Sequence, residues 1–261
     1  MESRKYIVAL GLEYEGTNYL GFQKQKSSKL TIQGLLEAGL KKVANQPIKT
    51  FCSGRTDSGV HALMQVIHFE TNSFRREDEW VRGVNSYLPH DIRLLWSKEV
   101  EESFHARFSA TDRSYRFIIR NSDTPSALWS KRSLYVPKKL DHIAMRKACK
   151  YLLGEHDFTS FRGSGCQSKT AIRNMKKIEI TKNKDLILID LNANAFLLHM
   201  VRVIVGTLIM VGKKEIKPLD LKKILESKDR KLAGKTVESS GLYYVGPRYP
   251  KNFNIPEPKI S

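Results

Sequence analysis

The sequence predicts an α+β protein of two similar subdomains, each with a mainly antiparallel sheet flanked by helices. Short segments of alternating apolar residues recur along the whole chain, as is typical of half-buried strands. Amphipathic helical patterns lie between these segments in both halves, and the stretch 104–110 separates the halves as a crossover. We therefore expect an amino-terminal subdomain over 1–106 and a carboxy-terminal subdomain over 107–261, with a cleft between them.

In the first half the expected order is β-α-β-β-α-β, which gives an open sheet with helices on one face. Thr31 suits the N-cap of the first helix because its side-chain oxygen can accept a bond from a free backbone N–H. Five residues alternate onto one face of the first strand: Tyr6, Val8, Leu10, Leu12 and Tyr14. The strands are expected over 5–16, 48–53, 65–70 and 92–100, and the helices over 31–45 and 77–88.

The second half again mixes strands with two main helices and one short helix. Asp141 can cap a helix that ends at Gly154, and Pro218 suits the first turn of the short helix. A polar loop over 157–170 carries Arg162, a candidate for substrate binding. The strands are expected over 113–120, 172–181, 186–192 and 241–248.

The longest apolar stretch, 195–212, is long enough to raise the question of a membrane span. His199 and Arg202 lie within it, and Gly206 falls near its middle. These residues favour a buried helix of a protein that does not enter a membrane.

Charge indicates the class of partner. The 261 residues contain 45 Lys and Arg against 27 Asp and Glu, a net charge of +18 that is spread along the chain. Such an excess favours a polyanion, with RNA or DNA ahead of an anionic membrane, and predicts salt-dependent binding. The basic segment 131–139 fits a solvated loop and a phosphate contact equally well.

The sequence gives no sign of a metal site or a bound cofactor. Cys52, Cys149 and Cys166 are far apart and odd in number, so we expect reduced thiols in a cytoplasmic protein without a signal peptide. The histidines lack metal-ligand spacing, and neither a P-loop nor a dinucleotide fingerprint is present. A metal nuclease would need several clustered carboxylates.

The segment 54–62, GRTDSGVHA, places Asp57 between two predicted strands, with Arg55 two residues before it. Taken alone, Thr-Asp-Ser-Gly is ordinary turn chemistry. A polar loop on a rigid scaffold is also where reacting groups are commonly presented. The segment by itself leaves both interpretations open.

Two distant residues bear on this choice. Arg202 is surrounded by apolar residues on its predicted helix, so its charge must reach solvent or pair with an anion, for which Asp57 is one candidate. Tyr115 lies on the apolar side of its strand. It is either a core aromatic or a stacking platform for a base taken out of a helix.

Several stretches, in the same order along the chain, closely resemble those of tRNA pseudouridine synthases of the TruA type. Besides GRTDSGVHA, these are LGFQ at 20–23, FHARFSA at 104–110, RSYRF at 113–117, GEHDFTSFR at 154–162, NAF at 194–196, HMVR at 199–202 and GLY at 241–243. The resemblance covers about 6–249. Ser58 stands where alanine is common in the family.

The resemblance implies the pseudouridine synthase fold and the isomerisation of uridine to pseudouridine at positions 38–40 of the tRNA anticodon stem-loop, by a homodimer that needs no cofactor or metal. DNA is not an expected partner. Asp57 matches the catalytic carboxylate, acting as a nucleophile or as a base toward the ribose. Arg55 matches the residue that takes the place of the flipped base, and Arg202 the partner of the aspartate. Tyr115 matches the residue that packs on the target base, and Leu242 an apolar wall of the uracil pocket.

Two other hypotheses remain open at this stage. A non-catalytic RNA-binding or RNA-chaperone protein would explain the charge and the aromatic residues, but not an acid within a basic cleft. A paralogue that modifies a different RNA or a different position would share all of these motifs.

Overall fold

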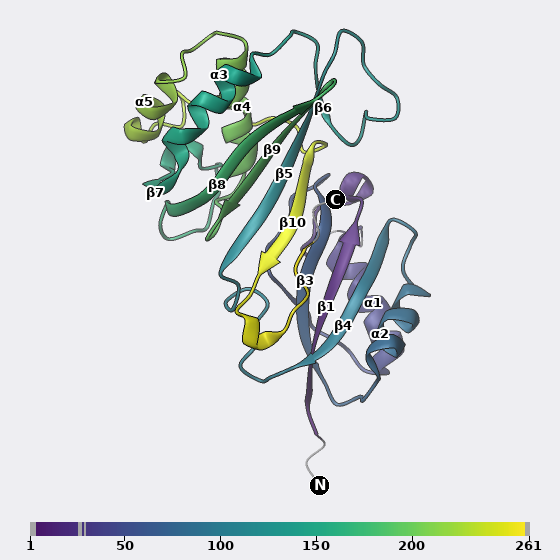
Figure 1. The fold of residues 1–261 in the computed structure, drawn as a ribbon. Helices are drawn as coiled ribbons and strands as arrows, with labels where there is room; N and C mark the ends of the chain where they lie inside the picture. Colours follow the sequence, from purple (N-terminus) through teal and green to yellow (C-terminus); the bar gives the residue numbers. More distant parts are fainter. Residues whose placement is uncertain (1–3, 26–27, 29, 259–261) are drawn as a thin grey trace. The chain divides into compact units, whose positions relative to one another are not determined.

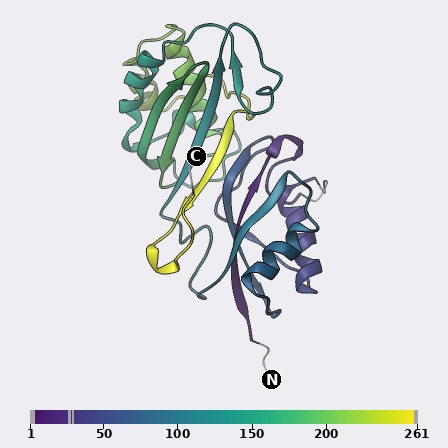
Figure 2. The same ribbon diagram turned by 45° about the vertical axis from the view of Figure 1, so that its right-hand side comes forward.

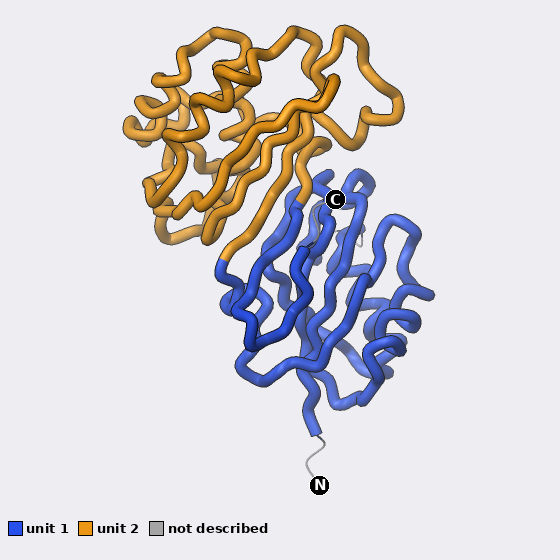
Figure 3. The backbone as a smooth tube through the Cα atoms, in the orientation of Figure 1, with its two compact units in different colours: residues 1–111, 244–261 blue, residues 112–243 orange. Residues whose placement is uncertain are grey.

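In the computed structural model of the chain, residues 4–25, 28 and 30–258 are described; residues 1–3, which contribute to the expectation that there is no signal peptide, lie outside them. The chain forms two compact units (Figure 3). Unit 1 comprises 1–111 and 244–261, and unit 2 comprises 112–243. The division expected at 106/107 differs from this, because the carboxy-terminal segment belongs with the first unit. There the Tyr249 hydroxyl donates to the Ala106 carbonyl at 2.7 Å, and the Phe253 ring lies 5.2 Å from that of Phe104.

Unit 1 is an antiparallel sheet with two helices. Strand β1 pairs antiparallel with both β3 and β4, and the strand order is β4-β1-β3-β10, with the short β2 also beside β3. Both helices lie on the same face of the sheet (Figures 1 and 2). The elements are β1 (Tyr6–Tyr14), α1 (Ile32–Ala44), β2 (Phe51–Cys52), β3 (His61–Thr71), α2 (Glu77–Asn85), β4 (Ile92–Val100) and the part of β10 (Leu242–Arg248) from Tyr244 onward, with 3-10 turns at Gly16–Asn18 and Lys251–Phe253.

Unit 2 repeats the combination of antiparallel strands and helices. Strand β9 lies between β5 and β8, and β7 pairs with the far side of β8. The short β6 runs parallel to β5. The elements are β5 (Asp112–Asn121), β6 (Leu134–Val136), α3 (His142–Cys149), β7 (Gly154–Asp157), β8 (Ile172–Asn183), β9 (Leu186–Ala193), α4 (Met200–Gly212) and α5 (Asp220–Ser227), with 3-10 turns at Lys150–Leu152 and Thr159–Phe161. The α+β class predicted from the sequence is confirmed in both units.

The expected β-α-β-β-α-β order of the first half is confirmed, and so are both capping predictions. The Thr31 hydroxyl accepts a bond from Gly34 N–H at the start of α1, and the Asp141 carboxylate accepts one from Ala144 N–H at the start of α3. Asn45, in the left-handed region at φ 53°, ends α1. The two N-caps, Thr31 and Asp141, each satisfy a backbone N–H that the helix itself leaves without a partner.

Strand β1 is more buried than its alternating pattern predicted. All five residues from Val8 to Leu12 are buried, so both of its faces are covered. The helices cover one face. On the other, Ala9 belongs to a core cluster with Met64, Val66, Phe104 and Ala106, and residues of the carboxy-terminal segment pack against it. A side chain at Gly11 would collide with the Trp96 indole, which explains a glycine in the middle of a strand.

The strand expected over 48–53 is wrong in extent, because only Phe51 and Cys52 are strand. The backbone of Thr50 bonds to helix α1 instead. Its N–H donates to the Glu37 carboxylate at 3.0 Å, and its carbonyl accepts from the Gln33 amide at 3.1 Å. Those bonds compete with pairing to β3, so the ladder begins one residue later.

The helix expected over 195–212 is also wrong at its start, since α4 begins at Met200. His199 stands before it in the left-handed region at φ 59°, a conformation that no helix interior accommodates. The carbonyl of the preceding residue, Leu198, accepts a hydrogen bond from Gly163 N–H at 2.8 Å. The predicted helices over 77–88 and 141–154 are likewise shorter, ending at Asn85 and Cys149. Within the described residues no helix is long and apolar enough to cross a membrane.

Candidate active site

The Asp57 segment forms a tight turn in unit 1 between β2 and β3. Val60 N–H closes the turn on the Asp57 carbonyl at 3.2 Å, and Gly59 takes a positive φ of 76° that most residues would resist. Asp57 is half-buried and Arg55 is exposed. The carboxylate and the guanidinium therefore come from one short loop whose backbone is well defined.

Thr56, immediately before Asp57, fastens this loop to the rest of unit 1. Its hydroxyl shares a 2.7 Å hydrogen bond with the Tyr14 hydroxyl at the end of β1, and its carbonyl accepts from Phe22 N–H at 3.0 Å. Thr56 and both partners are buried. Burial also raises the pKa of the Tyr14 hydroxyl, so that this group stays protonated as a hydrogen-bonding partner.

The segment 16–22 packs directly on the same turn. Gly21 has a φ of 86°, and a Cβ there would lie 2.8 Å from the Thr56 carbonyl oxygen. The Ser58 hydroxyl donates to the Tyr19 carbonyl at 3.0 Å, on the other side of Asp57. Contacts made by the Thr56 carbonyl and by the Ser58 hydroxyl, on either side of Asp57, thus restrict where its carboxylate can point.

A second set of bonds holds the start of the loop. The Gln65 amide on β3 donates to the Gly54 carbonyl at 2.6 Å and accepts from the Ser53 hydroxyl at 2.6 Å. Ser53 also bonds the Tyr244 hydroxyl on β10 at 2.9 Å. Neither Gln65 nor Tyr244 was predicted from the sequence as a positioning residue. The available signal was an amide between apolar neighbours, Leu63 and Met64 before it and Val66 and Ile67 after it, because a buried amide must find partners.

Tyr115 lies on β5 of unit 2, opposite Leu191 of β9. Its ring is half-buried and meets the Phe196 ring edge-on, with centroids 4.9 Å apart. Phe117 and Ile119, on the same side of the strand, are fully buried. Tyr115 is therefore at the margin of the core, partly covered by one aromatic neighbour.

Arg202 lies in the first turn of α4, where most of its neighbours along the helix are buried. Its Nε donates to the Val237 carbonyl at 2.7 Å, and the guanidinium is half-buried. The residues just before Val237 pack closely on the helix. A Cβ at Gly206 would lie 2.0 Å from the Lys235 carbonyl oxygen. Part of the Arg202 side chain is thus oriented by unit 2 itself.

Arg162 and Leu242 also belong to unit 2. The Arg162 guanidinium donates to the Cys166 carbonyl at 2.6 Å and to the Ser168 carbonyl at 2.8 Å, so it shapes its own polar loop. Leu242 is buried at the start of β10. Arg55 and Asp57 share unit 1, whereas Tyr115, Arg162, Arg202 and Leu242 share unit 2. An Arg202–Asp57 pair, which would join the units, stays a prediction.

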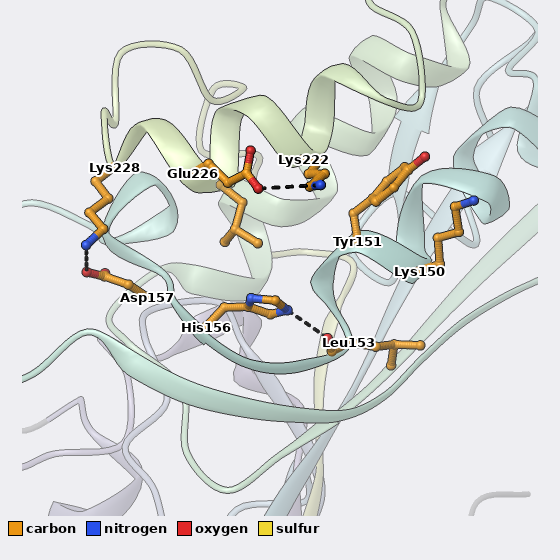
Figure 4. Close-up of a pocket in the computed structure, with 9 residues that line it drawn as sticks. Lys150, Tyr151, Leu153, His156, Asp157, Lys222, Glu226 and Lys228 are labelled. Atoms are coloured by element: carbon orange, nitrogen blue, oxygen red, sulfur yellow. Dashed lines mark hydrogen bonds and ion pairs between the residues drawn. The ribbon is translucent and has the colours of Figure 1, made fainter.

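A cavity of about 440 Å³ lies elsewhere in unit 2, between α5 and the segment around β7 (Figure 4). Asp157 and Lys228 form an ion pair of 3.1 Å at its edge. None of the six candidate site residues lines it: the lining residues are Lys150, Tyr151, Leu153, His156, Asp157, Lys222, Leu225, Glu226 and Lys228. This cavity is therefore separate from the candidate site.

Comparison with known proteins defines the class. The model of a family described as tRNA pseudouridine synthase matches residues 12–109 and 148–250, which include the Asp57 loop, Arg162, Arg202 and Leu242. The chain belongs to this tRNA pseudouridine synthase family.

Individual relatives agree. The chain is 48% identical to tRNA pseudouridine synthase A of Coxiella burnetii over 249 residues, covering 95% of both proteins. It is 48% identical to that of Vibrio campbellii, covering 97% of this chain and 96% of the relative. It is 46% identical to that of Colwellia psychrerythraea, covering 97% of both. Among solved structures, a Cbf5–Nop10–Gar1 complex is distantly similar, at 12% identity and a TM-score of 0.34, over 91% of this chain and 48% of that chain.

Proposed function

We propose that this chain isomerises uridine to pseudouridine at positions 38–40 of the tRNA anticodon stem-loop, with Asp57 as the catalytic carboxylate. The observation that carries the proposal is the way the Asp57 loop is held. A buried hydrogen bond fixes Thr56 before Asp57 and a part-buried one fixes Ser58 after it, while the aspartate itself remains half-exposed. Such preorganisation is what a reacting group requires.

The reaction is an isomerisation, so it balances without a co-reactant. The bond between ribose C1′ and uracil N1 breaks, the uracil turns, and a new bond forms between C1′ and C5. The proton on C5 is lost and N1 gains one. Asp57 assists the first step either by attacking C1′ as a nucleophile or by taking a proton from the ribose.

The remaining candidate residues surround this event. Exposed Arg55 enters the space that the flipped nucleotide leaves, and Arg202 pairs with the Asp57 carboxylate and orients it. Tyr115 packs on the target uracil, and Leu242 forms an apolar wall beside it. Arg162 contributes to substrate binding chiefly by shaping the 163–168 loop, to whose carbonyls it is bonded.

The setting proposed for this chemistry is a cleft between the two subdomains of a cytoplasmic homodimer. The net charge of +18 supports tRNA as the substrate, because each phosphate neutralised by Lys or Arg releases a counterion. Affinity for tRNA should then fall steeply as salt concentration rises.

The test is tritium release from a tRNA transcript labelled at uridine C5, since only pseudouridine formation sends that hydrogen to water. Asp57→Asn keeps the size of the side chain and removes its charge. We expect the rate to fall about a thousandfold or more while tRNA affinity stays within about twofold. Asp78→Asn on the exposed face of α2 removes the same charge far along the chain and should leave the rate unchanged.

The outcomes separate the alternatives. Normal turnover by Asp57→Asn would remove Asp57 from its assigned role. A wild-type protein that binds tRNA but forms no pseudouridine would instead support the non-catalytic RNA-binding hypothesis. Mapping pseudouridines in cells with and without the protein identifies a paralogue, because the missing modifications would then lie outside positions 38–40.

A further inference from the structure

A cluster of aromatic rings in unit 1 is not used by the proposed reaction. Phe51 of β2 stacks on His68 of β3 with centroids 5.1 Å apart and an interplanar angle of 24°. His105 lies 4.6 Å from His68, and Phe108 lies 4.4 Å from His105. The four rings thus form a connected row, which we call the Phe51–Phe108 row.

The two ends of this row face solvent. Phe108 is 74% exposed and Phe51 is 38% exposed, whereas His68 between them is buried. Single exposed apolar residues are common and need no explanation. Two exposed aromatic rings held in one connected row through two imidazoles are a more specific arrangement.

The exposed end is held in place by its own backbone. The Nδ1 atom of His105 accepts bonds from Arg107 N–H at 3.1 Å and Phe108 N–H at 3.3 Å. Below it, Ala106 N–H donates to His68 Nδ1 at 3.2 Å, and the Phe104 ring packs on Tyr249 at 5.1 Å. Phe108 is therefore presented by an ordered turn, so that a ligand binding to it meets a preformed surface.

Cations flank both exposed rings. Lys49 Nζ lies 5.4 Å from the centroid of Phe51, and the Arg107 guanidinium carbon lies 5.4 Å from that of Phe108. Aromatic rings bordered by positive charge are the combination that binds unpaired nucleotides, because the rings stack on bases and the cations neutralise phosphates. The apolar surface of a protein partner has no charge that Lys49 and Arg107 could neutralise, so these cations favour a nucleic acid.

The row also lies close to the candidate catalytic loop along the chain. Phe51 precedes Asp57 by only six residues, so even a fully extended backbone separates the two by about 20 Å. With phosphates about 3.4 Å apart along a stacked strand, an RNA bound at Asp57 has nucleotides within reach of the row.

We propose that the Phe51–Phe108 row is a stacking site for an unpaired base of the RNA substrate, separate from the base that is isomerised. The site would position the substrate strand relative to the Asp57 loop. This inference rests on the proposed function for the identity of the RNA, but it concerns binding and not chemistry.

The experiment measures the affinity of an unmodified tRNA transcript for wild type and Phe108→Ala. Removing one stacking ring should weaken binding by roughly five- to a hundredfold and raise KM with little change in kcat. Phe108→Trp retains a π face and should restore most of the affinity. Phe74→Ala removes another exposed aromatic of unit 1, 58% exposed, and should bind like wild type.

Salt dependence and a second ligand distinguish stacking from charge. Phe108→Ala should leave the slope of log affinity against log salt unchanged. Lys49→Ala should reduce the magnitude of this slope by about one, which corresponds to the loss of one phosphate contact. A fully paired RNA duplex offers no free base, so Phe108→Ala should not affect its binding.

Wild-type affinity for tRNA in Phe108→Ala, together with normal pseudouridine formation by the wild type, would overturn this inference alone. So would a change of oligomeric state in Phe108→Ala without a change in RNA affinity, since the row would then be a contact between copies of this chain. Absence of pseudouridine formation by the wild type would instead contradict the proposed function.

Discussion

The hydroxyl groups of Tyr14 and Thr56 share a buried hydrogen bond of 2.7 Å, which ties the residue before Asp57 to the end of the first strand. A buried hydrogen bond of this kind holds the loop more strongly than an exposed one would, because water does not compete for either partner.

Removal of that bond should affect catalysis only by changing the position of Asp57. In Tyr14→Phe the Thr56 hydroxyl loses its partner, and we expect about 1 kcal/mol of stability to be lost with about a tenfold lower kcat. Urea unfolding and tritium release measure the two effects. Tyr87→Phe, at a tyrosine 59% exposed on the surface, is the matched control. A stability loss without any effect on kcat would show that Thr56 does not position Asp57.

Gly21→Ala tests the packing of 16–22 against the loop. Its Cβ would lie 2.8 Å from the Thr56 carbonyl oxygen, so the Asp57 turn must shift, and we expect kcat to fall more than tenfold. Gly154→Ala provides the comparison. Gly154 also has a positive φ, 94°, but its Cβ would meet only His156 Nε2, at an ordinary contact distance of 3.8 Å. Equal losses of activity in the two variants would attribute the effect to backbone strain and not to the displaced loop.

A double-mutant cycle tests the Arg202–Asp57 pair. If the guanidinium holds the carboxylate, Arg202→Met should lower kcat by about a hundredfold in the wild-type background. It should have little further effect once Asp57→Asn has removed the charge. Circular dichroism should show α4 intact in both backgrounds. Fully additive losses of kcat in the cycle would show that Arg202 does not act through Asp57.

The pKa of His68 predicts an acid-sensitive unit 1. Burial, with a smaller contribution from nearby His105, lowers this pKa from 6.5 to about 4. The unfolded state therefore binds more protons at intermediate pH, so the stability due to neutral His68 is complete above about pH 6.5 and is lost as pH falls toward 4. Between about pH 7.5 and pH 5 this amounts to about 2 kcal/mol.

Urea unfolding of wild type and His68→Gln at both pH values measures the effect. The wild type should lose about 2 kcal/mol more than the variant on acidification. His105, whose pKa burial also lowers, contributes in the same direction, so His105→Gln should show a smaller version of the same change. Equal acid sensitivity in wild type and His68→Gln would contradict the prediction.

The sequence predicted most of the fold because local patterns decided it. Thr31 and Asp141 cap helices where their side chains can reach free N–H groups, and the alternating pattern of 113–120 falls within β5. The wrong boundaries came from tertiary contacts. Glu37 and Gln33 take the bonds of Thr50, and His199 adopts a left-handed backbone before α4.

The candidate site could be predicted only in part, for a related reason. Asp57 and Arg55 were singled out by a short motif together with the other family-like stretches, and their roles stay predictions, but the residues that hold the loop come from other parts of the chain. Gln65 is eleven residues from Gly54, and Tyr244 is 191 residues from Ser53. The single-sequence pattern carries no information about such pairs, because each polar side chain alone is compatible with many partners.

The return of the carboxy-terminal segment to unit 1 has a consequence for biosynthesis. Unit 2 is continuous, 112–243, and can fold as it leaves the ribosome. Unit 1 needs Tyr244, which is translated after all of unit 2, to complete the hydrogen bond to Ser53. A chain that stopped before Tyr244 would therefore carry the Asp57 loop without the bond from Tyr244 to Ser53, so synthesis must pass unit 2 before this loop is fully held.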